Sequence, residues 1–344
     1  MNRMLLVLPF VAVMAGCSAN NGNKSGQAAG AGVTGAGSTF VYPVLSAWAA
    51  DYKDQGGDKI NYQSIGSGAG IAQVKAGTVD FGATDQPLAS DDLAQSKLAQ
   101  FPVVIGGIVP VVNVSGIQPG KLRLTGPLLA DIFAGKVKTW NDKAITSINP
   151  GVSLPAANIA VVHRSDGSGT TFNFTHYLSQ VSATWKSGPG EGKTVNFPTG
   201  VGGKGNEGVA GYVKQIPNSI GYVEYAYVVQ NHMAYAALQN SAGNFVAPSA
   251  QTFSSAAESA NWAGAKDFNL VMTNAPGANA YPITATTFIL MPRQPTNKAR
   301  SEAAVKFFRF ALTKGQAQAQ KLDYVPLPAA LVQQVDAYIG ANIK

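Results

Sequence analysis

The segment that most constrains this chain runs from Ile159 to Thr171, where a β-branched stretch leads through small residues into a helical pattern. Arg164 ends the apolar stretch, residues 166–169 form a turn, and Phe174 and Leu178 are spaced for one face of a helix. The sequence therefore predicts a strand, a loop and a helix in succession, which is the repeating unit of α/β folds.

The predicted loop has the features of a site for a small oxyanion. Backbone N–H groups at a helix start point into the space beyond it, and the helix dipole favours negative charge there. Arg164 adds a guanidinium with several donors, and Ser168 and Thr170 add hydroxyl groups. The alternative is a surface turn in which Arg164 forms an ordinary ion pair.

Two further turns of small residues precede predicted helices. The first, residues 33–39, leads into an apolar helical face, and Ser38 or Thr39 is expected to be the N-cap. The second follows a predicted strand over 60–65, and Ser67 is expected to cap the short helix after it. The glycines in these turns do not have the spacing of a dinucleotide-binding motif.

An acidic residue, Asp85, follows a third predicted strand over 78–83. Because ligands of open α/β sheets lie beyond the carboxyl ends of the strands, Asp85 is expected near the hydroxyl groups of the two preceding turns. A carboxylate only accepts hydrogen bonds, so it would bind an anion that carries a proton, such as phosphate, and repel sulfate. The alternative role is an Asx-turn or a cap before Pro87.

The composition indicates a globular, loop-rich chain. Of its 344 residues only 12% are charged, while 38 are glycine and 19 are proline. This length can form two domains, each with its own core. The net charge of +7 comes from scattered basic residues rather than from a run, so the protein is not expected to bind nucleic acid.

The later part of the chain indicates how the domains are connected. Two apolar segments, 101–114 and 281–290, are predicted to be strands that cross between lobes. An aromatic segment over 220–227 is predicted to be a strand and a turn. Helices are predicted over 303–312 and 332–343, in a carboxyl-terminal part that returns to the first lobe.

The amino-terminal segment indicates export. Arg3 precedes an apolar run over 5–14 that is too short to span a bilayer, and Cys17, the single cysteine, follows closely. This resembles a bacterial lipoprotein signal, so residues 1–16 are expected to be a signal peptide, Cys17 to be lipidated and residues 17–32 to form a flexible tether. The alternative for a lone cysteine is a buried thiol.

Seven short motifs occur in order along the chain. They are Gly35–Phe40, Ile65–Gly68, Asp80–Asp85, Arg164–Thr170, Gly202–Asn206, Ile220–Tyr225 and Thr286–Leu290. Together they closely resemble the periplasmic phosphate-binding proteins of phosphate ABC transporters, from Val33 to the end of the chain. The resemblance implies an α/β, two-lobed class II periplasmic-binding-protein fold with a ligand cleft between the lobes and a two-strand hinge. Residues 33–104 and 283–344 would form one lobe, and residues 105–282 the other.

The resemblance also implies a ligand set and a role. The ligands would be Thr39, Phe40, Ser67, Asp85, Arg164, Ser168, Gly169 and Thr170. Asp166 would pair with Arg164 and hold its guanidinium in place. The protein would be a periplasmic, membrane-anchored monomer without metal or cofactor, which captures inorganic phosphate and passes it to membrane permease subunits. The sequence departs from the family at His163, where a second arginine is frequent.

Two other functions are open to such a chain. A phosphatase with Ser168 as nucleophile would need a base or metals, but His163, His176 and His232 are not spaced as a metal cluster. Ser168 also lacks the flanking glycines of a nucleophile elbow. A binding protein for sulfate, molybdate or tungstate would keep the fold, but Asp85 argues against an anion that offers no proton at neutral pH.

Overall fold

The computed structural model describes residues 32–344, and every structural statement below refers to them. The expected signal peptide, Cys17 and nearly all of the expected tether lie outside the described residues. Within residues 32–344, no helix combines the length and the apolar character that crossing a membrane requires.

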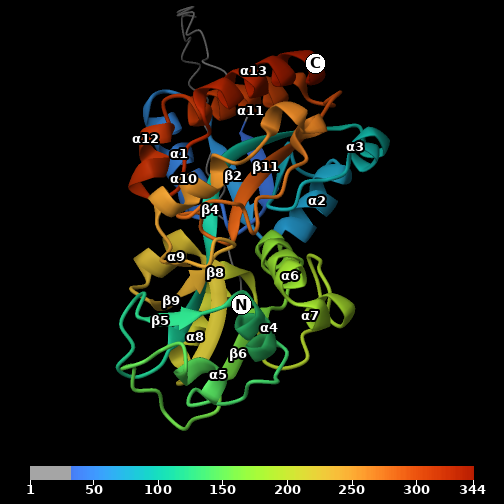
Figure 1. Ribbon diagram of the computed structural model, residues 1–344. Helices are drawn as coiled ribbons and strands as arrows, with labels where there is room; N and C mark the ends of the chain where they lie inside the picture. Colours follow the sequence, from blue (N-terminus) through green and yellow to red (C-terminus); the bar gives the residue numbers. More distant parts are fainter. Residues whose placement is uncertain (1–31) are drawn as a thin grey trace, which may run out of the picture. The chain divides into compact units, whose positions relative to one another are not determined.

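The strands form one 11-stranded sheet whose two halves are joined by β4 (Figure 1). The order in the first half is β2-β1-β3-β11-β4. Its strands are β1 (Val33–Gly37), β2 (Ile60–Ser64), β3 (Phe81–Thr84), β4 (Leu98–Asn113) and β11 (Thr284–Pro292). β1 is parallel to β2 and β3, whereas β11 is antiparallel to β3 and β4.

The second half continues from β4 in the order β8-β6-β7. Its strands are β5 (Leu122–Leu124), β6 (Ala160–Arg164), β7 (Val201–Gly203), β8 (Ser219–Glu224), β9 (Ala234–Gln239) and β10 (Phe245–Val246). β8 is antiparallel to β4 and parallel to β6, and β9 pairs with β4, β5 and β10. The strands β5, β6, β7 and β8 are each followed by a helix, as is typical of an α/β fold.

The helices divide between the two halves of the sheet (Figure 1). Around the first half lie α1 (Tyr42–Asp54), α2 (Ser67–Lys75), α3 (Ser90–Ser96), α10 (Ala250–Ala257), α11 (Lys298–Leu312), α12 (Gln316–Lys321) and α13 (Ala329–Asn342). Around the second lie α4 (Gly126–Phe133), α5 (Lys143–Thr146), α6 (Gly169–Val181), α7 (Ala183–Ser187), α8 (Gly205–Gln215) and α9 (Tyr225–Gln230). Two short 3₁₀ helices cover Trp262–Gly264 and Lys266–Phe268.

The second 3₁₀ helix packs against the first half of the sheet. The carbonyl oxygen of Asp267 accepts a hydrogen bond from Gln100 Nε2 at 2.9 Å, and its carboxylate accepts one from the Tyr338 hydroxyl at 2.9 Å. Asn269 Nδ2 donates to the carbonyl oxygen of Leu88 at 3.2 Å. In packing, this segment therefore belongs with the first half of the sheet, although it lies in the expected range 105–282.

β4 carries the chain from one half of the sheet to the other. Residues 98–107 pair with β11 and residues 108–113 pair with β8. A Cβ atom on Gly107 would lie 2.0 Å from the ring of Phe253, and one on Gly106 would lie 2.9 Å from the ring of Phe40. The crossing strand therefore needs glycine at these two positions, because the aromatic rings leave no space for a side chain.

The helix α6 is anchored by the face that its sequence predicts. Phe174 and Leu178 are both fully buried. The Phe174 ring stacks on Tyr222 of β8, with 4.1 Å between ring centroids, and meets Phe133 edge to face at 4.8 Å. Because such contacts order a helix, they also position the loop between Arg164 and the start of α6.

Two expected helix N-caps were wrong. The N-cap of α1 is Val41 and that of α2 is Gly66, and neither makes a side-chain capping bond. The hydroxyl groups of Ser38 and Ser67 instead lie 2.6 and 3.4 Å from oxygen atoms of the Asp85 carboxylate. Here the two hydroxyl groups act as donors to a buried carboxylate, whose charge would be costly without hydrogen-bond partners.

The aromatic segment over 220–227 also differs from the expected strand and turn. The strand β8 ends at Glu224 and the helix α9 follows at once. The Glu224 carboxylate accepts a hydrogen bond from the backbone N–H of Ala226 at 2.8 Å, so it caps this helix. The alternation of tyrosines predicts a strand and does not reveal that Glu224, within the same segment, caps a helix.

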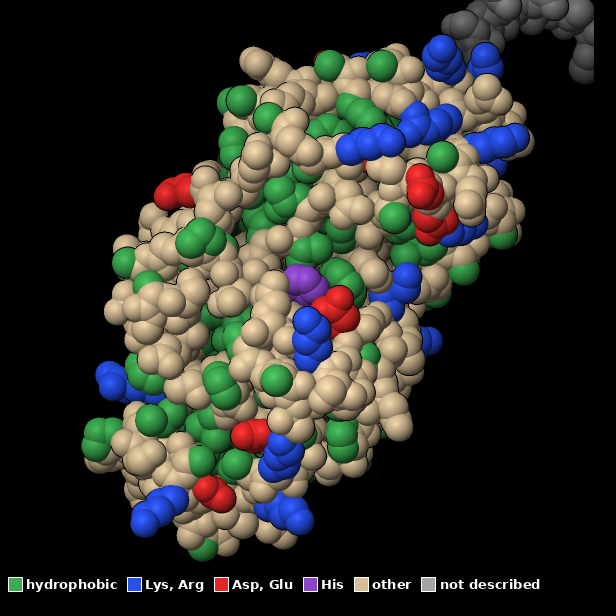
Figure 2. All heavy atoms as spheres, turned by 45° about the vertical axis from the view of Figure 1, so that its right-hand side comes forward, with side chains coloured by type: hydrophobic (Ala, Val, Ile, Leu, Met, Phe, Trp, Pro, Cys, Tyr) green, Lys and Arg blue, Asp and Glu red, His purple; other side chains and the backbone are tan. Residues whose placement is uncertain are grey.

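Basic side chains are spread over the surface. On the face that Figure 2 shows, Lys and Arg side chains lie singly or in small groups with neutral surface between them. The positions of the basic residues in the sequence are scattered in the same way. This face therefore has no continuous basic patch of the kind that nucleic-acid binding uses.

The close packing at the crossing strand gives a stability prediction. Gly107→Ala is expected to lower the free energy of unfolding by about 1–3 kcal/mol, because the new methyl group overlaps the buried ring of Phe253. Urea denaturation of both proteins measures this difference. As a control, Gly211→Ala places a methyl group in open space within α8 and is expected to leave stability unchanged or slightly raised. Equal stabilities of the wild type and Gly107→Ala would contradict the packing argument.

Candidate functional site

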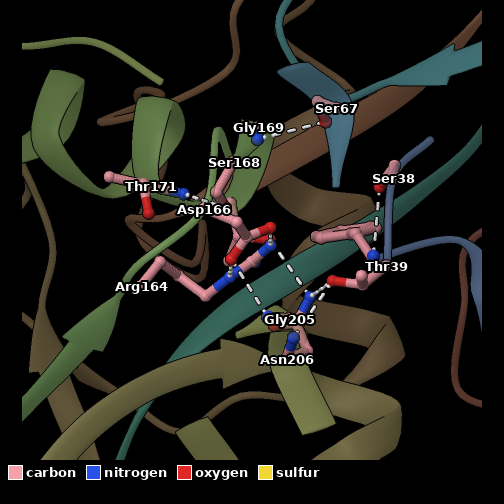
Figure 3. A network of polar contacts seen from close by, with 12 residues as sticks. Ser38, Thr39, Ser67, Arg164, Asp166, Ser168, Gly169, Thr171, Gly205 and Asn206 are labelled. Carbon is pink, nitrogen blue, oxygen red and sulfur yellow. Dashed lines mark hydrogen bonds and ion pairs between the residues drawn. The ribbon is translucent and has the colours of Figure 1, made fainter. Parts of the chain in front are cut away.

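The predicted site residues come together where ends of elements from both halves of the sheet meet (Figure 3). The eight expected ligands among them are buried. From the first half come Thr39 and Phe40 after β1, Ser67 at the start of α2 and Asp85 after β3. From the second half come Arg164 at the end of β6 and Ser168, Gly169 and Thr170 at the start of α6. The place matches the rule that ligands of α/β sheets lie beyond the carboxyl ends of strands.

The Asp85 carboxylate lies within a cluster of hydroxyl groups. Its Oδ1 accepts hydrogen bonds from Ser38 Oγ at 2.6 Å and from Thr287 Oγ1 at 2.7 Å, and its Oδ2 lies 3.4 Å from Ser67 Oγ. Burial raises the pKa of Asp85 to about 6, although the hydrogen bonds from Ser38 and Thr287 and the charge of Arg164 act to lower it. The site therefore contains a fixed hydrogen-bond acceptor that ionises below neutral pH.

The Arg164 guanidinium is held by a neighbouring acid. Its Nε donates to Asp166 Oδ1 at 2.8 Å and its Nη2 donates to Oδ2 at 2.6 Å, and the backbone N–H of Gly205 also donates to Oδ1 at 3.0 Å. Burial acts to raise the pKa of Asp166, but the hydrogen bonds and charge of Arg164 outweigh it, and the pKa is lowered. The third nitrogen, Nη1, is buried without a hydrogen-bond partner among the described residues. A buried, unpaired cationic donor favours an anionic ligand.

The start of α6 supplies further donors. Ser168 is the N-cap of this helix, and its Oγ accepts from the backbone N–H of Thr171 at 3.0 Å, which leaves its own proton free to donate. The backbone N–H of Gly169 donates to Ser67 Oγ at 3.1 Å. A Cβ atom on Gly169 would lie 2.7 Å from Cβ of Asp85, so only glycine permits this close approach.

The loop after β1 is held by contacts with both halves of the sheet. The carbonyl oxygen of Thr39 accepts a hydrogen bond from the Tyr227 hydroxyl at 2.7 Å. The backbone N–H of Phe40, an expected donor to the ligand, donates in the structure to Ser38 Oγ at 3.0 Å. The Thr39 hydroxyl accepts from the side chain of Asn206 at 2.7 Å. This loop is therefore rigidly placed beside Asp85.

A second buried acid lies behind the loop. The Tyr324 hydroxyl lies 2.6 Å from the carbonyl oxygen of Phe40 and 2.9 Å from Glu224 Oε2. A phenol has one proton, so it can donate to only one of these acceptors at a time. Burial raises the pKa of Glu224 well above its usual range, and the nearby charge of Asp85 raises it further. The Tyr324 hydroxyl therefore links the loop after β1 to the carboxyl group of Glu224.

Several residues of the site were not expected from the sequence. Thr287 was part of a recognised strand motif and Asn206 closed a glycine-rich motif, but neither was assigned a role. Two sequence features could have indicated them. Thr287 is a polar residue within an apolar run, and Asn206 is a polar residue at a helix start. Both contacts depend on pairing between segments far apart in the chain, which local spacing does not reveal.

The chemistry of the site is that of anion binding. Its groups are hydroxyls, backbone N–H groups, one guanidinium and one carboxylate acceptor. Among residues 32–344, no group of three His, Cys, Asp or Glu side chains is arranged to hold a metal ion. Such a site can orient and desolvate an oxyanion through hydrogen bonds.

Comparison with known proteins identifies the family. A family model described as a PBP superfamily domain matches residues 22–314. The phosphate-binding protein PstS of Xylella fastidiosa is 56% identical over 355 residues, which cover 99% of this chain and 98% of that protein. The PstS protein of Haemophilus influenzae is 52% identical over 91% of this chain and 93% of its own length. The chain belongs to the PstS family. The resemblance that the seven motifs indicated is thereby confirmed.

Solved structures share the fold of this PstS-family chain. A putative phosphate ABC transporter substrate-binding protein from Clostridium perfringens, with bound phosphate, aligns with a TM-score of 0.63 and 21% identity, over 87% of this chain and 100% of that one. The periplasmic phosphate-binding protein PfluDING, also with bound phosphate, aligns with a TM-score of 0.70 and 20% identity, over 89% and 93%. The two-lobed periplasmic-binding-protein fold is confirmed.

Family membership also decides between a binding protein and an enzyme. The PstS family consists of solute-binding proteins, so this chain is a binding protein and not an enzyme. The phosphatase interpretation, with Ser168 as nucleophile, is therefore not supported. The Ser168 hydroxyl instead caps α6.

The raised pKa of Asp85 predicts how stability depends on pH in phosphate-free buffer. Between about pH 4 and 6 the folded state binds more protons at Asp85 than the unfolded state, so the free energy of unfolding falls as pH rises. The loss attributable to Asp85 is expected to reach about 3 kcal/mol by pH 7. Asp85→Asn removes this contribution. Urea denaturation of both proteins at pH 4, 5, 6 and 7 measures it, and parallel pH profiles would contradict the assignment.

Proposed function

We propose that this protein captures inorganic phosphate in the cleft between its two lobes and delivers it to the permease of a phosphate ABC transporter. The observation that carries the proposal is that the site contains both a buried acceptor, Asp85, and a buried cationic donor, Arg164 Nη1, which has no hydrogen-bond partner among residues 32–344. The names of the PstS relatives and the phosphate in related structures support the same ligand.

The proposed ligands are those that the resemblance implied. They are Thr39, Phe40, Ser67, Asp85, Arg164, Ser168, Gly169 and Thr170, with Asp166 supporting Arg164. The hydroxyl and N–H donors and Arg164 would bind the unprotonated oxygen atoms of phosphate. The ionised carboxylate of Asp85 would accept the remaining P–OH proton. Sulfate has no such proton at neutral pH, and like-charge contact with Asp85 would cost several kcal/mol.

We further propose that the lobes comprise residues 33–104 with 283–344, and residues 105–282. Hydrogen bonds that join the two parts include Gly68 N to Gly167 O at 2.8 Å and Gly169 N to Ser67 Oγ at 3.1 Å. Bending at the two crossings between the lobes, near 105 and 283, would break these bonds and admit the ligand. The segment around Asp267 is an exception within 105–282, because its contacts with Gln100 and Tyr338 support its movement with the first lobe.

Isothermal titration with phosphate, with sulfate as competitor, tests the function. The chain from Ser18 onward is expected to bind one phosphate at neutral pH and to retain it in excess sulfate. In Asp85→Asn, the preference for phosphate over sulfate is expected to fall at least about tenfold, because the charge that repels sulfate is gone. Unchanged preference would contradict the role of Asp85. No phosphate binding by the wild type would contradict the function itself.

Delivery is tested by phosphate uptake in cells that lack their own phosphate-binding protein.

We also propose that the protein is a monomeric periplasmic lipoprotein. Residues 1–16 would be removed as a signal peptide, Cys17 would carry the lipid, and residues 17–32 would tether the body to a membrane. The apolar run before the single cysteine supports this. Mass spectrometry of the protein extracted from membranes is expected to show a diacylglyceryl-modified Cys17, and Cys17→Ser is expected to release the protein into the soluble fraction. An unmodified Cys17 in the membrane-extracted protein would contradict lipidation.

A further inference from the structure

Asn206 lies directly behind the proposed ligands, at the start of α8 (Figure 3). It is fully buried, and no ligand set that the sequence or the resemblance implied includes it. Its side-chain nitrogen Nδ2 donates to Thr39 Oγ1 at 2.7 Å and to Thr170 Oγ1 at 3.2 Å. One buried amide therefore contacts a proposed ligand hydroxyl from each half of the sheet.

The orientation of this amide is fixed by the backbone. The oxygen Oδ1 accepts a hydrogen bond from the backbone N–H of Glu224 at 2.9 Å. If the amide were rotated by a half turn, its NH₂ group would face this N–H, and two donors would meet without an acceptor. A buried mismatch of this kind is costly. Nδ2, the donating end, must therefore face Thr39 and Thr170.

The hydrogen bonds of Asn206 decide what the Thr39 hydroxyl can do. Thr39 Oγ1 accepts from Asn206 Nδ2 and also from the backbone N–H of Asn206 at 3.0 Å. A hydroxyl oxygen has two lone pairs and one proton. Because both lone pairs are engaged, the Thr39 hydroxyl can only donate to a ligand. Thr170 Oγ1 accepts from the same nitrogen, so its hydroxyl group is also favoured as a donor to a ligand.

We propose that Asn206 is a positioning residue that sets the Thr39 and Thr170 hydroxyls as donors to bound phosphate. This inference rests on the proposed function. A phosphate oxygen that faces Thr39 must then be unprotonated, because a P–OH group would find no acceptor there. The P–OH proton is thereby directed to Asp85, whose carboxylate is the acceptor in the site. Asn206 acts through these hydroxyl groups and does not itself contact the phosphate.

A double-mutant cycle tests this coupling. Phosphate affinity is measured by isothermal titration for the wild type, Asn206→Ala, Thr39→Val and the double variant. Asn206→Ala is expected to weaken binding about tenfold, because the Thr39 hydroxyl then loses its fixed donor role. In the Thr39→Val background, the same change is expected to weaken binding less than about threefold, because only the contact with Thr170 remains. Additive losses, or unchanged affinity of Asn206→Ala, would overturn the proposal.

A buried asparagine elsewhere provides the matched control. Asn149 is 3% exposed, and its amide is engaged by backbone groups of Arg123 and Ile145, none of which belongs to the site. Asn149→Ala is expected to lower the melting temperature, as Asn206→Ala does, but to leave phosphate affinity unchanged. Equal losses of affinity in both variants would show a general structural effect and overturn the proposal.

A second variant covers the case in which Asn206→Ala does not fold. Asn206→Asp keeps the shape of the side chain and the acceptor for Glu224 N–H, but replaces the donating end by an acceptor. The Thr39 proton would then turn toward the new carboxylate, and phosphate binding is expected to weaken more than tenfold. Wild-type affinity in Asn206→Asp would overturn the proposal. Wild-type protein that does not bind phosphate would instead refute the proposed function, and the inference with it.

Discussion

The buried carboxyl group of Asp85 is the constraint on which the rest of the site depends. A charged acid in such a place needs donors, and the sheet provides them through its strand order. In β1 and β3, Gly37 lies opposite Ala83, and in β3 and β11, Thr84 lies opposite Phe288. Ser38, Asp85 and Thr287 are each one residue from these positions, so neighbouring strands bring all three side chains together. An antiparallel β11 between β3 and β4 is therefore as important for the site as the loops that carry the ligands.

Two buried acids, Asp85 and Glu224, lie close to the site, and burial raises the pKa of both. Glu224 is paired with Ile108 of β4, at the level where this strand changes partners, and its carboxyl group contacts the Tyr324 hydroxyl. Burial raises the pKa of Glu224 well above its usual range and the charge of Asp85 acts in the same direction, whereas the hydrogen bonds from Tyr324 and Ala226 act to lower it. The Tyr324 hydroxyl also lies 2.6 Å from the carbonyl oxygen of Phe40, so it links the crossing strand to the ligand loop.

The parts of the structure that were predictable are those with a local signature. The small-residue turns, the apolar strand over 101–114 and the helix face with Phe174 and Leu178 follow from spacing alone. From the residues themselves, the site could be inferred only as an anion loop with Asp85 nearby; the full ligand set and the two-lobed fold came from resemblance to a family. The roles of Thr287 and Asn206 were not predicted, because their contacts join segments 202 and 167 positions apart along the chain. The N-caps were wrong for a related reason, since Ser38 and Ser67 serve Asp85 rather than their own helices.

The charges in the site explain why hydroxyl and N–H groups must supply much of the binding. Arg164 is paired with Asp166, so its charge is largely compensated before any ligand arrives. When Asp85 is ionised, these three side chains together carry one net negative charge. Attraction by net charge therefore cannot hold an anion here, and the net charge of +7 belongs to residues elsewhere in the chain. What remains is a set of fixed dipoles: the start of α6, the backbone N–H groups and the hydroxyl groups whose direction Asn206 helps to set. A site of this kind distinguishes anions by the number and position of their protons, because each added or missing proton leaves one fixed donor or acceptor unmatched.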